Sequence, residues 1–360
     1  MSEESLRIVI VGAGTLLGKA LNDELAVSAL ASADFHLIDD DEALGKLAAT
    51  ADEVTFIQRI EPDSFDGCDF SFFAGSPELT RKHWRQALKA GSSIVDLTGE
   101  LEGEPGILVR APWIQDDPNA SGHSSNVRPR KKSQTAAPDL QTRAVVSAHP
   151  VAVLLALLTA RSQRIAPLHG LWATLLQPAS EYGHAALEEL HQQTANLLSF
   201  QPLRTEVFGS QTAFTLAVSF GSQDRDALSK AAELIRGQFA KIAVTPAPLA
   251  LQVIQAPIFH GYALSVAVEF DRPIAAAALA GALAGSHLRI VPSASEFPGN
   301  VQAVEEEDVQ VLVRPVFEGI AEKTERFWLW IVADNLKFAA QNAIACAVEL
   351  NRLRPRGSVQ

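Results

Sequence analysis

Short apolar runs alternate with helical patterns through the first 150 residues of the chain. Residues 6–11 (LRIVIV) are apolar and β-branched, and leucines recur at helical spacing through residues 16–30. Further apolar runs predict strands at residues 35–38, 53–57, 69–73, 93–96 and 144–148. Residues 77–90 predict a helix that stops at Gly91. Apolar strands that alternate with helices indicate an α/β domain with a parallel sheet covered on both faces.

The second half of the chain has a different pattern, with longer strands and intervening helices. Strands are predicted at residues 171–177, 212–220, 252–258, 263–270, 309–316 and 327–333. Helices are predicted at residues 151–162, 184–197, 225–238, 274–284 and 335–353. This is an α+β pattern with a sizeable sheet. The predicted domains are residues 1–148 with 334–360, and residues 149–333.

Residues 117–142 interrupt the pattern and are rich in Pro, Ser, Asn and Gln. The basic run RPRKK at residues 128–132 is consistent with a phosphate-binding patch or with a solvated, flexible loop. The loop is favoured because no aromatic residues stand among the charges. The whole chain of 360 residues carries a formal charge of −12, which argues against a nucleic-acid partner.

Cysteine content and the N-terminus bear on the compartment. The two cysteines, Cys68 and Cys346, exclude a disulfide scaffold and show no zinc-ligand spacing, so no metal is expected. The N-terminal residues lack the pattern of a signal peptide, and the apolar run at residues 151–158 is too short to span a bilayer. These features predict a cytoplasmic protein without a membrane partner.

A glycine-rich turn follows the first strand. GAGTLLG places Gly12, Gly14 and Gly18 between that strand and a helix, which resembles a dinucleotide-binding turn. The second strand ends in the acids Asp39–Asp41, which would accept hydrogen bonds from a ribose and repel a 2′-phosphate. NAD is therefore favoured over NADP as the cofactor. A turn kept for packing and a solvated acidic turn are the alternatives.

Several segments, in order along the chain, resemble the aspartate-semialdehyde dehydrogenase family. They are GAGTLLG, FFAGSPELTRKHWRQALKAGSSIVD (72–96), LLQPASEYGHAALEELHQQT (175–194) and WIVADNLKFAAQNA (330–343). The last segment is the most specific. The resemblance implies a Rossmann-type domain, a mixed-sheet dimerisation domain and a homodimer. It also implies cofactor contacts by Gly12, Gly14, Thr15, Leu16, Gly18, Asp39, Ala74, Gly75, Ser76 and Asn342.

The family mechanism needs groups that this chain has exchanged. In the family a cysteine thiolate attacks the aldehyde, a histidine is the acid/base, hydride passes to the nicotinamide, and phosphate releases the acyl group. Here the nucleophile position falls on Ala152 and the acid/base position on Tyr262. The substrate glutamine is retained as Gln177, whereas the two anion-binding arginines become Gln255 and Glu102. A methyl group cannot replace a thiolate as nucleophile.

Three hypotheses follow from the exchanged residues. The first is a divergent, Usg-type paralogue without catalysis that binds a dinucleotide or another small molecule as a homodimer. The second is an active NAD(P)-dependent semialdehyde dehydrogenase of amino-acid biosynthesis with a residue that the alignment does not show. The third is a dinucleotide-binding sensor that signals through domain closure.

Overall fold

The computed structural model describes residues 5–40, 47–50, 53–116, 137–221, 225–244, 247–292, 298–317 and 322–354. The chain divides into two compact units. The first contains Met1–Trp113, Gln134–Pro150 and Leu336–Gln360, and the second contains Ile114–Ser133 and Val151–Asn335. Most of the loop predicted at residues 117–142 lies outside the described residues, as does Asp41.

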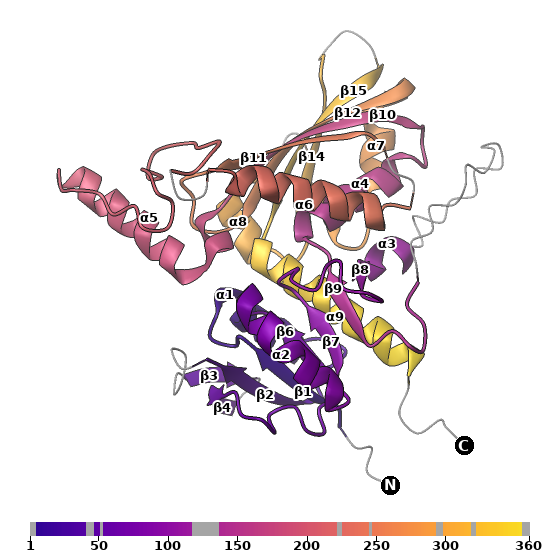
Figure 1. The fold of residues 1–360 in the computed structure, drawn as a ribbon. Coiled ribbons are helices and arrows are strands. Elements are labelled where there is room, and N and C mark those ends of the chain that lie inside the picture. The colour runs from indigo at the N-terminus through magenta and orange to yellow at the C-terminus, as the bar shows by residue number, and fades with distance from the viewer. Residues whose placement is uncertain are drawn as a thin grey trace. The chain divides into compact units, whose positions relative to one another are not determined.

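The helices and strands up to residue 147 are drawn in indigo to magenta in Figure 1. They are β1 (Arg7–Val11), α1 (Leu16–Ala26), β2 (Asp34–Asp39), β3 (Leu47–Thr50), β4 (Glu53–Phe56), β5 (Gln58–Arg59), β6 (Phe70–Phe73), α2 (Pro77–Lys89), β7 (Ser93–Asp96), β8 (Leu108–Arg110), α3 (Pro112–Asp116) and β9 (Ala144–Ser147).

The remaining elements run from residue 150 to the C-terminal helix. They are α4 (Pro150–Ser162), β10 (Leu168–Gln177), η1 (Ala179–Tyr182), α5 (Gly183–Leu198), α6 (Ala227–Ile242), β11 (Leu249–Gln255), β12 (Tyr262–Ala275), α7 (Ala276–Leu283), β13 (Leu288–Ile290), α8 (Asn300–Glu305), β14 (Val309–Pro315), β15 (Lys323–Ala333) and α9 (Asn335–Leu353).

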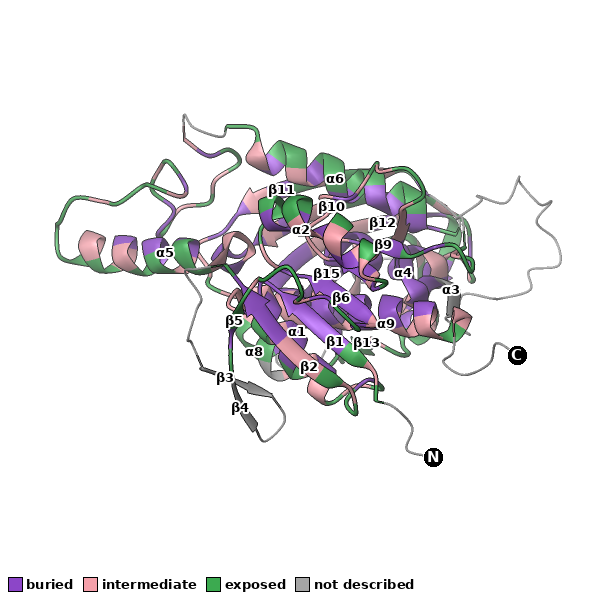
Figure 2. Ribbon diagram, turned by 60° about the horizontal axis from the view of Figure 1, so that its bottom comes forward, coloured by how far each residue is buried: buried purple, intermediate pink, exposed green. Residues whose placement is uncertain are grey.

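The first unit contains a parallel sheet in the order β5-β2-β1-β6-β7-β9-β8. Alternate residues of β1 enter different cores. Ile8 and Ile10 pack with α1 and α9, whereas Val9 and Val11 pack with α2. Both faces of the sheet are therefore covered, and β6 is buried along its whole length (Figure 2). This arrangement confirms the predicted Rossmann-type α/β fold.

The second unit contains a mixed sheet in the order β11-β10-β12-β15-β14-β13. The β10–β11 and β13–β14 pairs are parallel, and the pairs of β12 with β10 and β15 are antiparallel. This confirms the predicted second, mixed-sheet domain. One face of the sheet is partly open, because Trp172 and Trp328, both in register with Ala267, are 47% and 46% exposed.

Two predicted strands are wrong in detail. The segment 53–57 does not join the parallel sheet: Glu53–Phe56 pairs antiparallel with β3, and Gln58–Arg59 takes the edge beside β2. The segment 212–220 forms a single bridge, Ala217 to Gln255, instead of a strand. Its backbone is bound by a helix, since Gln193 Oε1 of α5 accepts the amide hydrogens of Thr212 and Ala213.

Candidate functional site

The glycine-rich turn links β1 to α1 at the carboxyl end of a central strand. The strands β2 and β6, which follow β1 in the chain, lie on its opposite sides, and such switch points bind ligands at the carboxyl ends of the strands in open parallel sheets. Gly12 has a φ of +86°, and a Cβ there would lie 2.3 Å from Gly75 Cα. A Cβ on Gly18 would lie 2.1 Å from the carbonyl oxygen of Gly12. Glycine is therefore required by close backbone approach at both positions.

Contacts between three segments close this turn. The Thr15 hydroxyl lies 2.9 Å from Gly12 O and 2.8 Å from Ala74 O, and it accepts the amide hydrogen of Gly18 as the N-cap of α1, whose first residue is Leu16. The Gly14 N–H donates to Asp39 Oδ2 at 2.7 Å. The structure thus brings seven of the predicted cofactor residues together: Gly12, Gly14, Thr15, Gly18, Asp39, Ala74 and Gly75.

Asp39 changes the electrostatics of the turn. Its carboxylate is buried and occupies the Gly14 amide, which in this type of turn is a donor available to a phosphate. Its second oxygen accepts the amide hydrogen of Asp40. The turn therefore carries its own carboxylate at the end of β2.

Two further predicted cofactor residues serve the first unit in different ways. Ser76 caps α2, because its Oγ accepts the amide hydrogen of Leu79. Asn342 on α9 is buried, and its Nδ2 donates to Ser147 Oγ at 2.8 Å and lies 3.2 Å from Arg110 O. In the described part of the chain, Asn342 Oδ1 has no hydrogen-bond partner.

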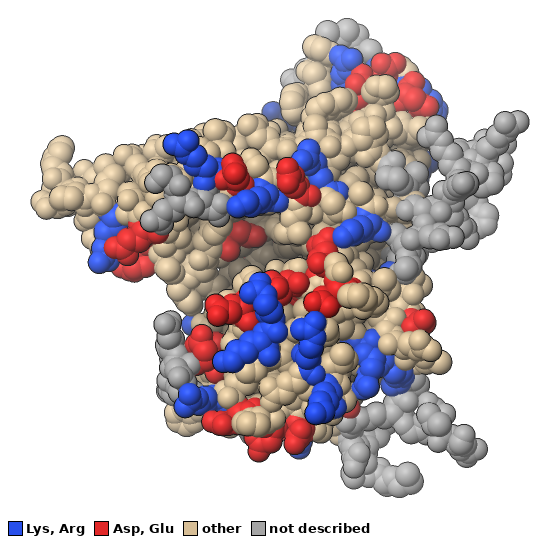
Figure 3. Space-filling view, in the orientation of Figure 1, with Lys and Arg blue, Asp and Glu red and all other residues tan. Residues whose placement is uncertain are grey.

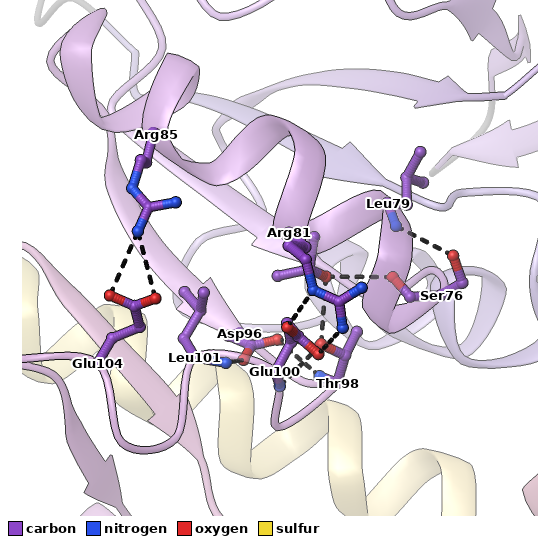
Figure 4. A network of polar contacts seen from close by, with 10 residues as sticks. Ser76, Leu79, Arg81, Arg85, Asp96, Thr98, Glu100, Leu101 and Glu104 are labelled. Atoms are coloured by element: carbon purple, nitrogen blue, oxygen red, sulfur yellow. Dashed lines mark hydrogen bonds and ion pairs between the residues drawn. The ribbon is translucent and has the colours of Figure 1, made fainter.

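The loop that contains Glu102 is acidic and is bound to α2 (Figure 4). Arg81 forms two hydrogen bonds with Glu100, at 2.6 and 2.8 Å, and Arg85 donates to Glu104 at 3.2 Å. These ion pairs direct both guanidinium groups to carboxylates of the same unit. The loop therefore carries Glu102, the residue that the sequence predicts at the position of a family arginine, between two further acids.

Buried Asp96 organises the base of the same loop. Its carboxylate accepts the amide hydrogens of Thr98 and Leu101 at 2.8 and 2.9 Å, and the Thr98 hydroxyl at 2.6 Å. Burial raises the pKa of Asp96, and the hydrogen bonds from Thr98 and Leu101 act in the opposite direction. The shape of the loop thus depends on a buried carboxylate that is well supplied with donors.

In the second unit, the structure brings Gln177, Gln255 and Tyr262 together at one end of three neighbouring strands of the mixed sheet. Gln177 ends β10 and is in register with Gln255, which ends β11. Leu176 pairs with Ala263, so Gln177 and Tyr262 are the next residues along two antiparallel strands. Residues that are paired across strands point to the same face of the sheet. The three residues that the sequence predicts at substrate and acid/base positions are therefore neighbours.

Tyr262 is bound to a carboxylate. Its hydroxyl donates to Glu181 Oε2 at 2.6 Å, and the ring is buried. Burial, the negative charge of Glu181 and this hydrogen bond together raise the pKa of Tyr262 well above its usual value. Asn335 completes the cluster: its amide group lies 3.1 Å from the Ser180 hydroxyl, and its Oδ1 accepts the amide hydrogen of Gly261 at 3.1 Å.

Ala152 stands at the predicted nucleophile position, and the two cysteines carry the thiols of the chain. Ala152 lies in the first turn of α4 and is fully buried. Cys68 and Cys346 are free thiols in the two hydrophobic cores of the first unit. Burial raises the pKa of Cys68 to about 11, and burial together with the charge of Glu349 raises that of Cys346 further. Neither thiol is a thiolate at neutral pH.

Sequence reasoning did not assign site roles to Glu181, Ser180 and Asn335. Glu181 and Ser180 stand in the segment ASEYG, and Asn335 stands in the signature VADNL. The polar residues of ASEYG directly after a long strand were the available signal. Glu181 contacts Tyr262, 81 positions away, and Asn335 contacts Gly261, 74 positions away, and only the fold shows these contacts.

Surface charge, metal-ligand groups and membrane-spanning helices are the remaining features of interest. Basic and acidic side chains are interspersed on the face drawn in Figure 3. Over the described ranges, no three His, Cys, Asp or Glu side chains are arranged to hold a metal ion. No helix within the described residues is both long enough and apolar enough to cross a membrane.

Comparison with known proteins extends over nearly the whole chain. Residues 161–338 match the family described as semialdehyde dehydrogenase, dimerisation domain. The chain is 30% identical to a USG-1 protein homolog of Pseudomonas aeruginosa, over 95% of this chain and 96% of that protein. It belongs to the semialdehyde dehydrogenase family. It is also 24% identical to aspartate-semialdehyde dehydrogenase 2 of Vibrio cholerae, over 97% of this chain and 98% of that enzyme.

Solved structures of the family share this fold. The structure of a probable aspartate-semialdehyde dehydrogenase from Pseudomonas aeruginosa superposes with a TM-score of 0.79 at 25% identity, and covers 99% of this chain and 100% of that one. Aspartate semialdehyde dehydrogenase from Candida albicans, solved with NADP, is more distant, with a TM-score of 0.61 at 11% identity over 97% of this chain and 99% of that one.

Proposed function

We propose that this chain is a non-catalytic member of its family, a homodimer that binds a dinucleotide or another small molecule without dehydrogenase turnover. The observation that carries the proposal is the pair of exchanged chemical groups in the second unit. Ala152 presents a buried methyl group at the nucleophile position, and the hydroxyl of Tyr262, at the acid/base position, donates a hydrogen bond to Glu181.

Acyl transfer through a thioester needs a thiolate. Ala152 has no nucleophilic atom, and the raised pKa values of Cys68 and Cys346 keep both thiols protonated at neutral pH. Both cysteines also pack in hydrophobic cores of the first unit. Loss of the nucleophile in a cooperating catalytic unit lowers the rate on the order of 10⁴-fold or more.

Proton transfer is disfavoured in the same way. A general base must accept a proton near neutral pH, whereas Tyr262 has a pKa well above its usual value. The neighbouring carboxylate of Glu181 opposes ionisation of the phenol, so Tyr262 acts as a hydrogen-bond donor. Anion binding is weakened besides, because Gln255 is uncharged and Glu102 is negative where the family has arginines.

The first unit offers residues that fit a dinucleotide. The close approach of Gly12 and Gly75 leaves no side chain over the turn, and the buried Asn342 Oδ1, without a partner among the described residues, can accept from an amide N–H. Such a cofactor supplies a hydride acceptor when bound. Asp39 and Asp40 support NAD over NADP, since a 2′-phosphate would add two negative charges beside them.

The open face of the mixed sheet supports a homodimer. Trp172 and Trp328 expose nearly half of their surface there, and exposed aromatic patches of this kind mark protein interfaces. The family match to a dimerisation domain covers these strands. Two unpaired thiols suit a reducing compartment, and we expect the protein in the cytoplasm.

A turnover assay tests the proposal. The purified protein is incubated with aspartate semialdehyde, phosphate and either NAD or NADP, and formation of reduced cofactor is followed. We expect a rate indistinguishable from the blank, while calorimetry detects NAD more readily than NADP. Turnover at ordinary enzyme rates, about 1 s⁻¹ or faster, contradicts the proposal.

The second candidate is an active dehydrogenase, as the 24% identity with the Vibrio cholerae enzyme over 97% of the chain suggests. The same assay separates the two. The variant Ala152→Cys restores only the thiol. If the protein is non-catalytic as proposed, this variant remains inactive, because Tyr262 and Gln255 still replace the family's histidine and arginine. An inactive wild type that becomes fully active through this one change would mean that the remaining machinery is intact.

A further inference from the structure

The ends of β10 and β11 carry two buried glutamines side by side. Gln177 is 2% exposed and Gln255 is fully buried, and the two are in register on parallel strands. Gln255 Nε2 donates to the carbonyl oxygens of Gln177 and Ala256, at 3.1 and 3.0 Å. Both amide hydrogens are therefore used by carbonyl groups. This fixes the orientation of the Gln255 side chain, because a flipped amide would place its oxygen against two carbonyl oxygens.

The two side chains leave one donor and one acceptor. In the part of the chain that the structure describes, Gln177 Nε2 and Gln255 Oε1 have no hydrogen-bond partner. Buried polar atoms without partners are rare in folded proteins and ask for an explanation such as a ligand. A primary carboxamide matches this pair, since its oxygen accepts and its NH₂ group donates.

The charge of the surrounding cluster favours the same class of ligand. Gln177, Gln255, Tyr262 and Asn335 are neutral, and the one charged member of the cluster is Glu181, which accepts the Tyr262 hydroxyl. A carboxylate placed here would meet a negative charge and no cation within these five residues. An uncharged amide avoids that repulsion while keeping two hydrogen bonds.

We infer that the ligand of this site carries an uncharged primary carboxamide, which Gln177 binds at its oxygen and Gln255 binds at its nitrogen. The inference rests on the proposed function, in that it names the ligand class of a protein that binds rather than turns over a semialdehyde. It predicts discrimination between two compounds that differ only in this group.

The probes are L-asparagine and L-aspartate, applied to the full chain in calorimetry and thermal unfolding. We expect saturable binding of L-asparagine and at least about tenfold weaker binding of L-aspartate. Gln177→Leu removes the donor and is expected to weaken L-asparagine binding at least about tenfold. Gln255→Arg adds a cation and is expected to shift preference to L-aspartate. Gln252→Leu, an exposed glutamine of the same strand, is the control and should bind as the wild type does.

The wild-type comparison decides even if a variant does not fold. Equal or tighter binding of L-aspartate overturns the inference. Binding of neither compound also overturns it and leaves water as the partner of the two glutamines. Loss of L-asparagine binding in Gln252→Leu would place the ligand elsewhere and overturn it as well. None of these binding results changes the result of the turnover assay. A wrong ligand class can therefore be distinguished from a wrong proposal that the protein is non-catalytic.

Discussion

Tyr262 should retain its proton at a pH where an ordinary phenol loses it. The chain has two tyrosines, so Tyr182→Phe leaves Tyr262 as the single phenol. Phenylalanine keeps the ring packing of Tyr182 against Phe208 and Phe220, at centroid distances of 6.1 and 5.2 Å. A phenol with the usual pKa of 10.0 is half ionised at pH 10. Because burial and Glu181 raise the pKa of Tyr262, we expect clearly less than half ionisation of the folded variant at that pH.

The same shift predicts how stability depends on pH. The unfolded phenol releases its proton near pH 10, whereas the folded one holds it to higher pH, so above pH 10 the folded state binds up to one more proton. The contribution of Tyr262 is thus complete below pH 10 and declines above it. One proton corresponds to a slope of at most about 1.4 kcal/mol per pH unit. Tyr182→Phe/Tyr262→Phe should lack this slope, and loss of the hydrogen bond should cost it about 1–3 kcal/mol at pH 8.

Ultraviolet absorbance of the phenolate and urea unfolding measure the two effects. Absorbance is recorded from pH 8 upward in the folded Tyr182→Phe protein and again in concentrated urea, with tryptophan fluorescence as the check that the protein is folded. The free energy of unfolding is then compared between the single and double variants at each pH. A folded midpoint near pH 10, or identical slopes in both variants, would refute the assignment of a buried Tyr262–Glu181 pair.

Three further outcomes follow from the structure. Gly12→Ala should cost about 1–3 kcal/mol more in urea unfolding than Gly99→Ala, because both glycines have a positive φ but only the first would place its Cβ against backbone atoms; equal costs would contradict the close approach. Asp96→Asn should lower the free energy of unfolding by about 1–3 kcal/mol, because the NH₂ group of asparagine then faces the amide hydrogen of Thr98 or of Leu101, which the carboxylate accepts. An unchanged value would argue against the loop network. Trp172→Glu should yield a monomer in light scattering, whereas Val27→Glu should not, and a dimeric Trp172→Glu protein would exclude this face as the interface.

Much of the architecture follows from local pattern. The helix 77–90 was predicted from its periodicity and closing glycine, and α2 has Ser76 as cap, Pro77 in the first turn and Gly91 in a left-handed conformation. The predicted C-terminal helix has the same bounds as α9. The strand–turn–helix setting of Gly12 was also local information. Such elements are predictable because capping and hydrophobic periodicity act over a few residues.

Non-local hydrogen bonds decided where local pattern misled. Residues 212–220 have a strand-like alternation, with Phe214 and Leu216 exposed, yet Gln193 of α5 takes the backbone amides that a strand partner would need. The run 53–57 looked like a strand of the parallel sheet, but its partner is the neighbouring β3. Sequence spacing alone does not specify which acceptor a given amide will meet.

The sequence by itself determined the family and the fold class, because these depend on residue identity in a recognisable order. It also predicts that chemical groups of the family are replaced at Ala152, Tyr262, Gln255 and Glu102. Only the tertiary structure decided what the replacements contact. Gln255 donates to Gln177 across 78 positions, and Tyr262 donates to Glu181 across 81. Protonation and ligand class depend on such distant neighbours, since pKa and hydrogen-bond satisfaction are properties of the packed environment.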